Sequence, residues 1–397
     1  MEGLLALIGD VVADPQSYVD DMLTMLRNEK GVREACVRTG RALENISLRS
    51  HPEKSEIVIS GRNAKAVQMR ERLANNPAMM QGNPVKVSEA GMYLGIKVSQ
   101  CGHKDTIDMT VRHRVAKTWG RVADIKAVIN DARMSKLGWL RAGITLIKAI
   151  VIPSMSYSGE VWVNANKATE KFLRDEFKSI IYVIMEIPTH TKWTSVLADL
   201  NLPNIQSVVD KMKINFMSHT LWGEGDKKLR EILKEEHRLL PENSMINAVD
   251  ETCALYKIPA VSQMRLDKVL VKRQVKLMDE INIWVSNVKS PATRNVGLER
   301  VRASTNFYRL SKREAQALIA FNASAFKLKT AWGDFHKVQS CLAPLCDGLD
   351  GLEHIKECQF YKVKWTASCE KDSLLLARYL VGVDKERRRR WRGECLF

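Results

Sequence analysis

Four potential metal ligands fall within an eighteen-residue window, at Cys341, Cys346, His354 and Cys358. Their spacing is C-x4-C-x7-H-x3-C, and a tetrahedral Zn²⁺ ion takes four such thiolate and imidazole ligands. Proline, aspartate and glycine residues stand between them, where a small knuckle must turn sharply. His354 and Cys358 are four residues apart and would share one face of a helical turn. Since three of the eight cysteines lie here together with a histidine, chance is the weaker explanation, and the sequence predicts one structural zinc ion.

A reducing compartment fits this use of thiols. The N-terminal run GLLALIG is too short for an ordinary signal peptide, and no stretch of eighteen uncharged apolar residues could span a membrane. We therefore expect an intracellular protein, nuclear or cytoplasmic, that is neither secreted nor membrane-bound. Four of the other five cysteines are expected to be buried small hydrophobic residues, at Cys36, Cys101, Cys253 and Cys369.

The net charge of +16 is the main departure from an average composition. Residues 1–26 hold five carboxylates and no Lys or Arg, so they carry −5 and the remainder carries +21. Such a basic chain attracts polyanions, nucleic acid first.

Residues 111–129 show a helical period of apolar residues. Off that apolar stripe lie the cations Arg112, Arg114, Lys117, Arg121 and Lys126. A solvated amphipathic helix would look similar, but the charge of +7 across residues 111–148 favours a helix that faces phosphates.

A second basic segment is KERRRRWRG at residues 385–393. Arginine forks bind phosphates well, and the candidate residues are Arg387, Arg388, Arg389 and Arg390. A nuclear-localisation patch or an unstructured polar tail would explain the segment equally well.

The run SYVDDMLTML at residues 17–26 predicts a hairpin with Asp20 and Asp21 at its turn. Two-metal phosphoryl transfer needs clustered carboxylates of this kind. An ordinary Asp-Asp turn is the alternative interpretation.

Several short segments of the sequence resemble motifs of one protein family, and they occur in the same order as in that family. Residues 18–21, Y-V-D-D, resemble the Y-x-D-D box of reverse transcriptases, and Lys54 stands before a predicted strand at 56–60 as in that family's palm. Residues 92–96, M-Y-L-G-I, are similar to the primer-grip hairpin of LINE-type (non-LTR) retrotransposon enzymes. The stretches at 153–162 and 196–205 and the zinc knuckle resemble later parts of the same proteins.

This resemblance implies an RNA-directed DNA polymerase. Asp20 and Asp21 would bind Mg²⁺ in the complete enzyme, and Lys54 would lie near the nucleotide phosphates. Tyr93 and Gly95 would hold the primer end. The implied partners are RNA, DNA or an RNA–DNA heteroduplex, with nucleotides as the only small-molecule substrates and no membrane.

The expected fold class is α+β. It would comprise a half-palm (1–100), a helical thumb (101–190), a helical linker (191–335), a zinc knuckle of CCHC type (336–365) and a basic tail (366–397). The family's earlier palm aspartate and fingers precede the Y-x-D-D box by more residues than are present here, so residues 1–397 are expected to be inactive alone. The alternative is a non-catalytic zinc-knuckle nucleic-acid-binding protein derived from a retroelement.

Overall fold

The computed structural model describes residues 16–18, 21–23, 26, 28–51, 54–131, 138–189, 191–224, 227–288, 310–322, 366, 375–376 and 378–383. The predicted knuckle ligands and the arginine-rich tail lie outside these residues. The chain forms two compact units, and each is described by itself. Unit 1 comprises residues 1–114 and 164–169, and unit 2 comprises residues 115–163 and 170–397.

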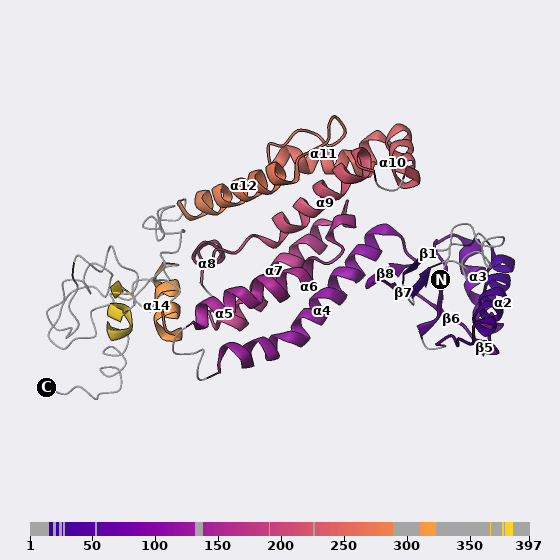
Figure 1. Cartoon of the computed structure of the whole chain (residues 1–397), viewed down its shortest axis with the longest axis horizontal. Helices are drawn as coiled ribbons and strands as arrows, with labels where there is room; N and C mark the ends of the chain where they lie inside the picture. The colour runs from indigo at the N-terminus through magenta and orange to yellow at the C-terminus, as the bar shows by residue number, and fades with distance from the viewer. Residues whose placement is uncertain are drawn as a thin grey trace. The chain divides into compact units, whose positions relative to one another are not determined.

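Unit 1 combines short strands with two helices (Figure 1). Its elements in chain order are β1 (Gln16–Tyr18), β2 (Asp21–Leu23), α2 (Glu29–Asn45), β3 (Glu56–Val58), α3 (Ala64–Asn75), β4 (Met79–Met80), β5 (Asn83–Pro84), β6 (Lys86–Ser88), β7 (Ala90–Tyr93), β8 (Ile96–Ser99) and the first half of α4 (His103–Ile129). The pairs β1–β2, β4–β5 and β7–β8 are antiparallel, and β3–β6 is parallel with α3 as the crossover.

The helices of unit 1 begin where short polar side chains cap them. The Asn28 side chain accepts a hydrogen bond from Gly31 N at 2.8 Å, and the Asn63 side chain accepts one from Ala66 N at 2.9 Å. Their apolar faces then meet β3 in a small core. That core contains Val32, Ile59, Ala66, Leu73 and Ala78.

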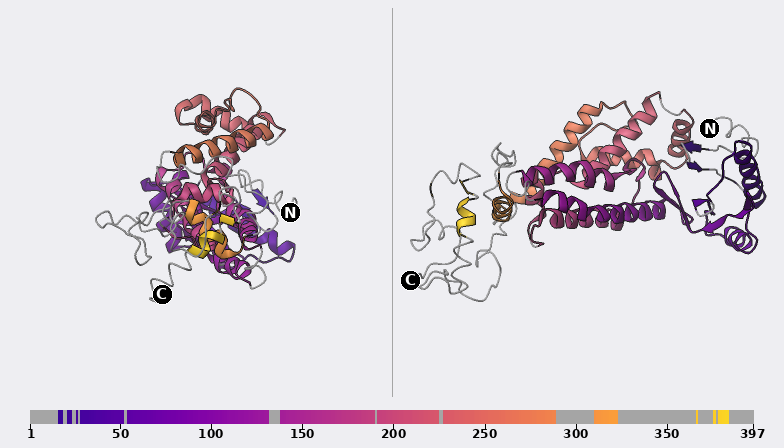
Figure 2. Two further views of the ribbon diagram at one scale, coloured as in Figure 1. Left: turned by 90° about the vertical axis from the view of Figure 1, so that its left-hand side faces the viewer. Right: turned by 60° about the horizontal axis from the view of Figure 1, so that its bottom comes forward.

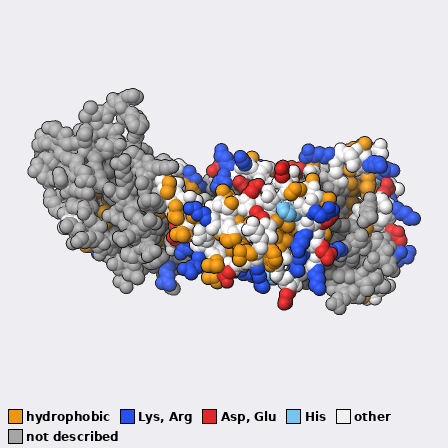
Figure 3. All heavy atoms as spheres, turned by 90° about the horizontal axis from the view of Figure 1, so that it is seen from above, with side chains coloured by type: hydrophobic (Ala, Val, Ile, Leu, Met, Phe, Trp, Pro, Cys, Tyr) orange, Lys and Arg blue, Asp and Glu red, His pale blue; other side chains and the backbone are white. Residues whose placement is uncertain are grey.

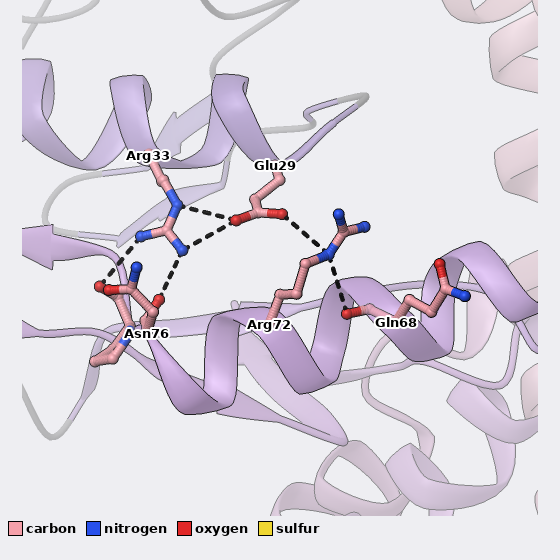
Figure 4. A network of polar contacts seen from close by, with 6 residues as sticks. Glu29, Arg33, Gln68, Arg72 and Asn76 are labelled. Carbon is pink, nitrogen blue, oxygen red and sulfur yellow. Dashed lines mark hydrogen bonds and ion pairs between the residues drawn. The ribbon is translucent and has the colours of Figure 1, made fainter.

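A bridge of charged groups links α2 to α3 (Figure 4). The Glu29 carboxylate lies 3.0 Å from Arg33 Nη2 and 3.5 Å from Arg72 Nε. Arg33 also donates to the carbonyl oxygen of Asn76 at 2.7 Å, just beyond the end of α3. Three side chains from α2 and α3 and one backbone carbonyl just after α3 therefore converge on one surface site.

The regular elements described in unit 2 are all helices. It contains the rest of α4, then α5 (Trp139–Leu146), the π-helical η2 (Ile147–Val151), α6 (Ile152–Ser156), η3 (Gly159–Val161), most of α7 (Lys167–Met185), α8 (Trp193–Leu200), α9 (Ile205–Trp222), α10 (Lys227–Leu239), η4 (Pro241–Asn243), α11 (Met245–Leu255), α12 (Lys268–Val288) and α14 (Lys312–Asn322). The views in Figures 1 and 2 show α9 and α12 lying alongside one another, and α12 packs on both α8 and α9.

Apolar side chains spaced at the helical period fill the interior of unit 2. Trp139, Phe177 and Met155 are fully buried. The apolar stripe predicted on residues 111–129 is also buried, from Val111 to Ile129. Trp119 in this stripe is only partly buried, and its indole N–H donates to Glu176 at 2.7 Å.

One helical stretch among the described residues, Trp139–Ser156, is long and apolar enough to cross a membrane. Half of it is buried inside the protein, including Ile147 and Val151 with no exposed surface. It also carries Arg141 and Lys148. This is the behaviour of a core helix in a globular unit.

The fold is mainly helical with a few short strands, which confirms the α+β class at that coarse level. The finer division into palm, thumb, linker, knuckle and tail stays a prediction. Cys253 is buried as expected and Cys36 is partly buried, but Cys101 is exposed, so its prediction as a buried residue was wrong. Cys101 lies two residues after the end of β8, in the turn before α4, where it is exposed.

Candidate nucleic-acid interface

The two hairpins that resemble polymerase elements both belong to unit 1. In the first, β1 and β2 are antiparallel, with Tyr18 opposite Asp21. Asp21 opens β2, while Asp20 lies outside the described residues. Strand β2 runs beside β7, the first strand of the second hairpin. Segments far apart in the sequence thus become neighbours.

The second hairpin turns over two residues. Tyr93 pairs with Ile96, and between them Leu94 and Gly95 have φ of 47° and 75°. Two consecutive positive φ values are the signature of a type I′ turn, whose twist matches that of the flanking strands. Tyr93 is half-buried at the end of β7.

A buried arginine hydrogen-bonds to the backbone of the Gly95 turn. Arg114 Nη2 donates to the Gly95 carbonyl oxygen at 2.6 Å, and Arg114 is only 6% exposed. A Cβ on Gly95 would lie 1.9 Å from that nitrogen. The expectation that Arg114 faces phosphates beside its neighbours on α4 is therefore corrected, because its guanidinium points into unit 1 and fixes the turn.

The other predicted cations of α4 differ in their surroundings. Arg112 Nε lies 2.7 Å from Asp108, whose other oxygen accepts from the Thr169 hydroxyl at 2.7 Å. Partial burial acts to raise the pKa of Asp108, but the hydrogen bonds from Arg112 and Thr169 outweigh it and lower this pKa below its ordinary value. Lys117 and Arg121 are exposed one turn apart. These two are the α4 cations best placed for phosphates.

Lys54 is exposed two residues before β3. Strand β3 lies next to β7 as well as β6. Asp21, Lys54 and Tyr93 are thus on, or two residues from, three neighbouring strands of unit 1. The side chain of Asp21 is not among those described.

Unit 2 contains a buried polar cluster that the sequence patterns did not indicate. Asp210 on α9 lies 3.3 Å from Lys213 Nζ, and their side chains are 8% and 7% exposed. The same carboxylate accepts from Gln206 Nε2 at 2.9 Å and from the Tyr256 hydroxyl at 2.9 Å. Burial, and then the charge of Asp210, raise the pKa of Tyr256. A buried ion pair satisfied by several hydrogen bonds is a structural device rather than an exposed binding site.

A further group of cations gathers along α12, outside every segment that the sequence patterns emphasised. Within residues 268–276, four Lys or Arg residues occur without a carboxylate. Lys148 on η2 and Lys211 on α9 face this helix, as described below. In the sequence, this charge run on α12 was the only sign of the group, because Lys148 and Lys211 come from distant segments.

The predicted zinc ligands Cys341, Cys346, His354 and Cys358 lie outside the described residues, and so do Arg387 to Arg390. Within the residues that are described, no group of three or more His, Cys, Asp or Glu side chains could hold a metal ion.

Comparison with known proteins gives no relative: no family model, no curated protein and no solved structure matches this chain.

Proposed function

We propose that the protein binds RNA–DNA template–primer duplexes as the C-terminal part of a non-LTR retrotransposon reverse transcriptase. The observation that carries the proposal is the adjacency of β2 and β7 in unit 1. One strand belongs to the segment that resembles the Y-x-D-D box, and the other to the segment that resembles the primer grip. A polymerase needs the metal-binding carboxylates close to the primer end, since positioning supplies much of the rate of phosphoryl transfer.

Charge supports the binding part of the proposal. Outside its first 26 residues the chain carries +21, and Lys117 and Arg121 project from α4 into solvent. Cations on a helix contact the phosphate backbone without reading base edges, so little sequence preference is expected.

Equilibrium titration of a labelled RNA–DNA duplex with a recessed 3′ end tests this proposal. Binding should weaken steeply between roughly 50 and 200 mM salt, because each phosphate contact releases counterions. Lys117→Gln/Arg121→Gln should reduce the slope of log K against log salt by about 2, roughly 0.9 for each phosphate that is no longer neutralised. Affinity that does not change with salt would contradict nucleic-acid binding.

The alternative function is non-catalytic nucleic-acid binding by a retroelement-derived protein. It predicts the same binding but no DNA synthesis. Primer extension on an RNA template separates the two. We expect binding without extension by residues 1–397; extension that Asp21→Ala abolishes would assign the polymerase activity to this chain itself.

The zinc knuckle is also proposed, on the spacing of its four ligands. Purified protein should contain one equivalent of zinc, and Cys346→Ser should lose it because a structural site needs all four ligands. Cys101→Ser is the matched control, since Cys101 is exposed and lies outside the ligand window. Wild-type protein with less than about a tenth of an equivalent would contradict the site.

A further inference from the structure

Five lysines from four separate segments lie on α12 or close to it. Lys272 and Lys276 stand one turn apart on α12 itself. Lys211 comes from α9, Lys148 from η2, and Lys192 from the residue before α8. The helices α8 and α9 both pack against α12. This set is named the lysine track below.

Hydrogen bonds fix the register of α12 against its neighbours. Asp279 on α12 accepts from Asn204 N at 2.9 Å and from the Ser207 hydroxyl at 3.1 Å, at the start of α9. Lys211 lies seven residues after Asn204, and Lys272 lies seven residues before Asp279. Since each residue of a helix advances about 1.5 Å, antiparallel packing brings both lysines to the same level, about 10 Å from the Asp279 contact.

The opposite end of the track is also held by a hydrogen bond. Lys192 Nζ donates to the Ser286 carbonyl oxygen of α12 at 2.8 Å. From Lys272 to Ser286 the helix rises about 21 Å. One nucleic-acid strand advances about 3.4 Å for each phosphate along a duplex, so the track matches roughly six nucleotides.

These lysines repel one another. Burial and then the charge of Lys276 lower the pKa of Lys148, and burial and then the charge of Lys272 lower the pKa of Lys211. Glu280 lies 3.7 Å from Lys276. Across the described ranges, Lys148, Lys211 and Lys272 have no carboxylate within ion-pair distance. Like charges held together in this way favour the binding of a polyanion.

The backbone around Lys148 has an unusual conformation. It lies in the π-helical segment Ile147–Val151, whose first and last residues have no exposed surface. π-helical turns are rare and occur frequently at functional sites. Lys148 itself is exposed between these two buried residues.

We propose that the lysine track binds the phosphate backbone of a nucleic-acid duplex through its ammonium groups, independently of sequence. This inference rests on the proposed function and deepens it by locating a phosphate-binding surface in unit 2. Figure 3 views the molecule from the top of Figure 1, and on this face Lys and Arg side chains are spread among Asp, Glu and exposed hydrophobic side chains. Among the α12 side chains whose exposure is described, the most exposed hydrophobic ones are Val269 and Leu270.

The test compares two fourfold variants of the full chain in titrations of the RNA–DNA duplex. The track variant is Lys148→Gln/Lys211→Gln/Lys272→Gln/Lys276→Gln. The control removes the same charge from exposed lysines elsewhere in unit 2, as Lys171→Gln/Lys227→Gln/Lys234→Gln/Lys257→Gln. The track variant should bind at least about tenfold more weakly and its salt slope should fall by about 3.6, roughly 0.9 for each lysine, whereas the control should stay close to wild type.

If the track variant fails to fold, Lys211→Gln and Lys272→Gln singly should each lower the slope by about 0.9. Equal losses of affinity in the track and control variants would overturn the track while leaving the proposed function intact. Wild-type protein that does not bind the duplex would overturn both. Poly-glutamate that competes as well as the duplex, charge for charge, would overturn the nucleic-acid assignment in favour of an acidic protein partner.

Discussion

In unit 1 most of the described arginines bind carboxylates or carbonyl oxygens of the same unit. Arg33 and Arg72 form ion pairs with Glu29, and Arg114 donates a hydrogen bond to the Gly95 carbonyl oxygen. In unit 2 a buried lysine, Lys213, is paired with Asp210, whereas Lys148 and Lys211 lie beside other lysines. Pairing is what a structural role for a charged group requires. Cations held together without that pairing point to a partner outside the chain, and this contrast separates structural from binding charges here.

The largest effect is expected from Asp210→Ala. Removing this carboxylate leaves Lys213 buried without its counter-charge and takes an acceptor from Tyr256, so the free energy of unfolding should fall by about 3–5 kcal/mol. Chemical denaturation monitored by circular dichroism measures it.

The double variant Asp210→Leu/Lys213→Met serves as its control, because an apolar pair of similar volume avoids the stranded charge. It should recover most of the stability. A double variant as unstable as Asp210→Ala would show that the ion pair is not the source of the effect.

Gly95→Ala should have the next largest effect, in unit 1. The new Cβ would lie 1.9 Å from Arg114 Nη2, and φ of 75° is itself unfavourable for alanine. We expect a loss of about 2–3 kcal/mol, from backbone strain and the displaced arginine together.

Gly82→Ala isolates the strain, since Gly82 has φ of 77° and a Cβ there meets nothing within 4 Å. It should cost about 1 kcal/mol. Equal thermal shifts in the two variants would remove the proposed role of Arg114 in fixing the turn.

Asp279→Asn should stabilise unit 2 at neutral pH, by a smaller amount. Burial raises the pKa of Asp279, although hydrogen bonds from Asn204 and Ser207 act to lower it. The folded state therefore holds its proton more tightly than the unfolded state, and stability falls as pH rises from the unfolded pKa to the folded pKa. Asparagine can accept the same hydrogen bonds without a charge.

Thermal melts as a function of pH measure this difference. The Tm of Asp279→Asn should exceed that of wild type at pH 7, and the gap should close in acid below the unfolded pKa. A variant less stable than wild type at pH 7 would mean that the ionised carboxylate is itself required.

Glu29→Gln should give the smallest effect. The two arginines that Glu29 meets are partly exposed, with side-chain exposures of 32% and 63%. Solvent screens such pairs, so the loss should stay below about 1 kcal/mol and shrink further at high salt. A loss as large as that of Gly95→Ala would show that unit 1 depends on its surface ion pairs.

Local patterns in the sequence predicted local structure well. The apolar period of residues 111–129 gave a buried helical stripe. Such a stripe depends only on neighbours within a helical turn or two. Strands β4, β5 and β6 were missed, because two or three residues are too few to show an alternation.

Contacts between distant segments could not be predicted in the same way. Arg114 looked like its exposed neighbours, because the carbonyl oxygen that it binds belongs to a turn nineteen residues earlier. The Asp210–Tyr256 hydrogen bond and the meeting of Lys211 with Lys272 likewise depend on how α9, α11 and α12 pack. The predicted metal ligands stay predictions based on spacing alone.

The central claim is that the lysine track of unit 2 contacts nucleic-acid phosphates. Acylation of lysine amines at neutral pH, quantified for each residue by mass spectrometry with and without the RNA–DNA duplex, tests it most directly. Without duplex, Lys148 and Lys211 should be acylated faster than other lysines of similar exposure, because their lowered pKa leaves more of the amine neutral. With duplex, Lys148, Lys211, Lys272 and Lys276 should be protected together, while Lys171, Lys227 and Lys234 should react as before. Protection spread evenly over both sets, or absent from the track, would contradict the account.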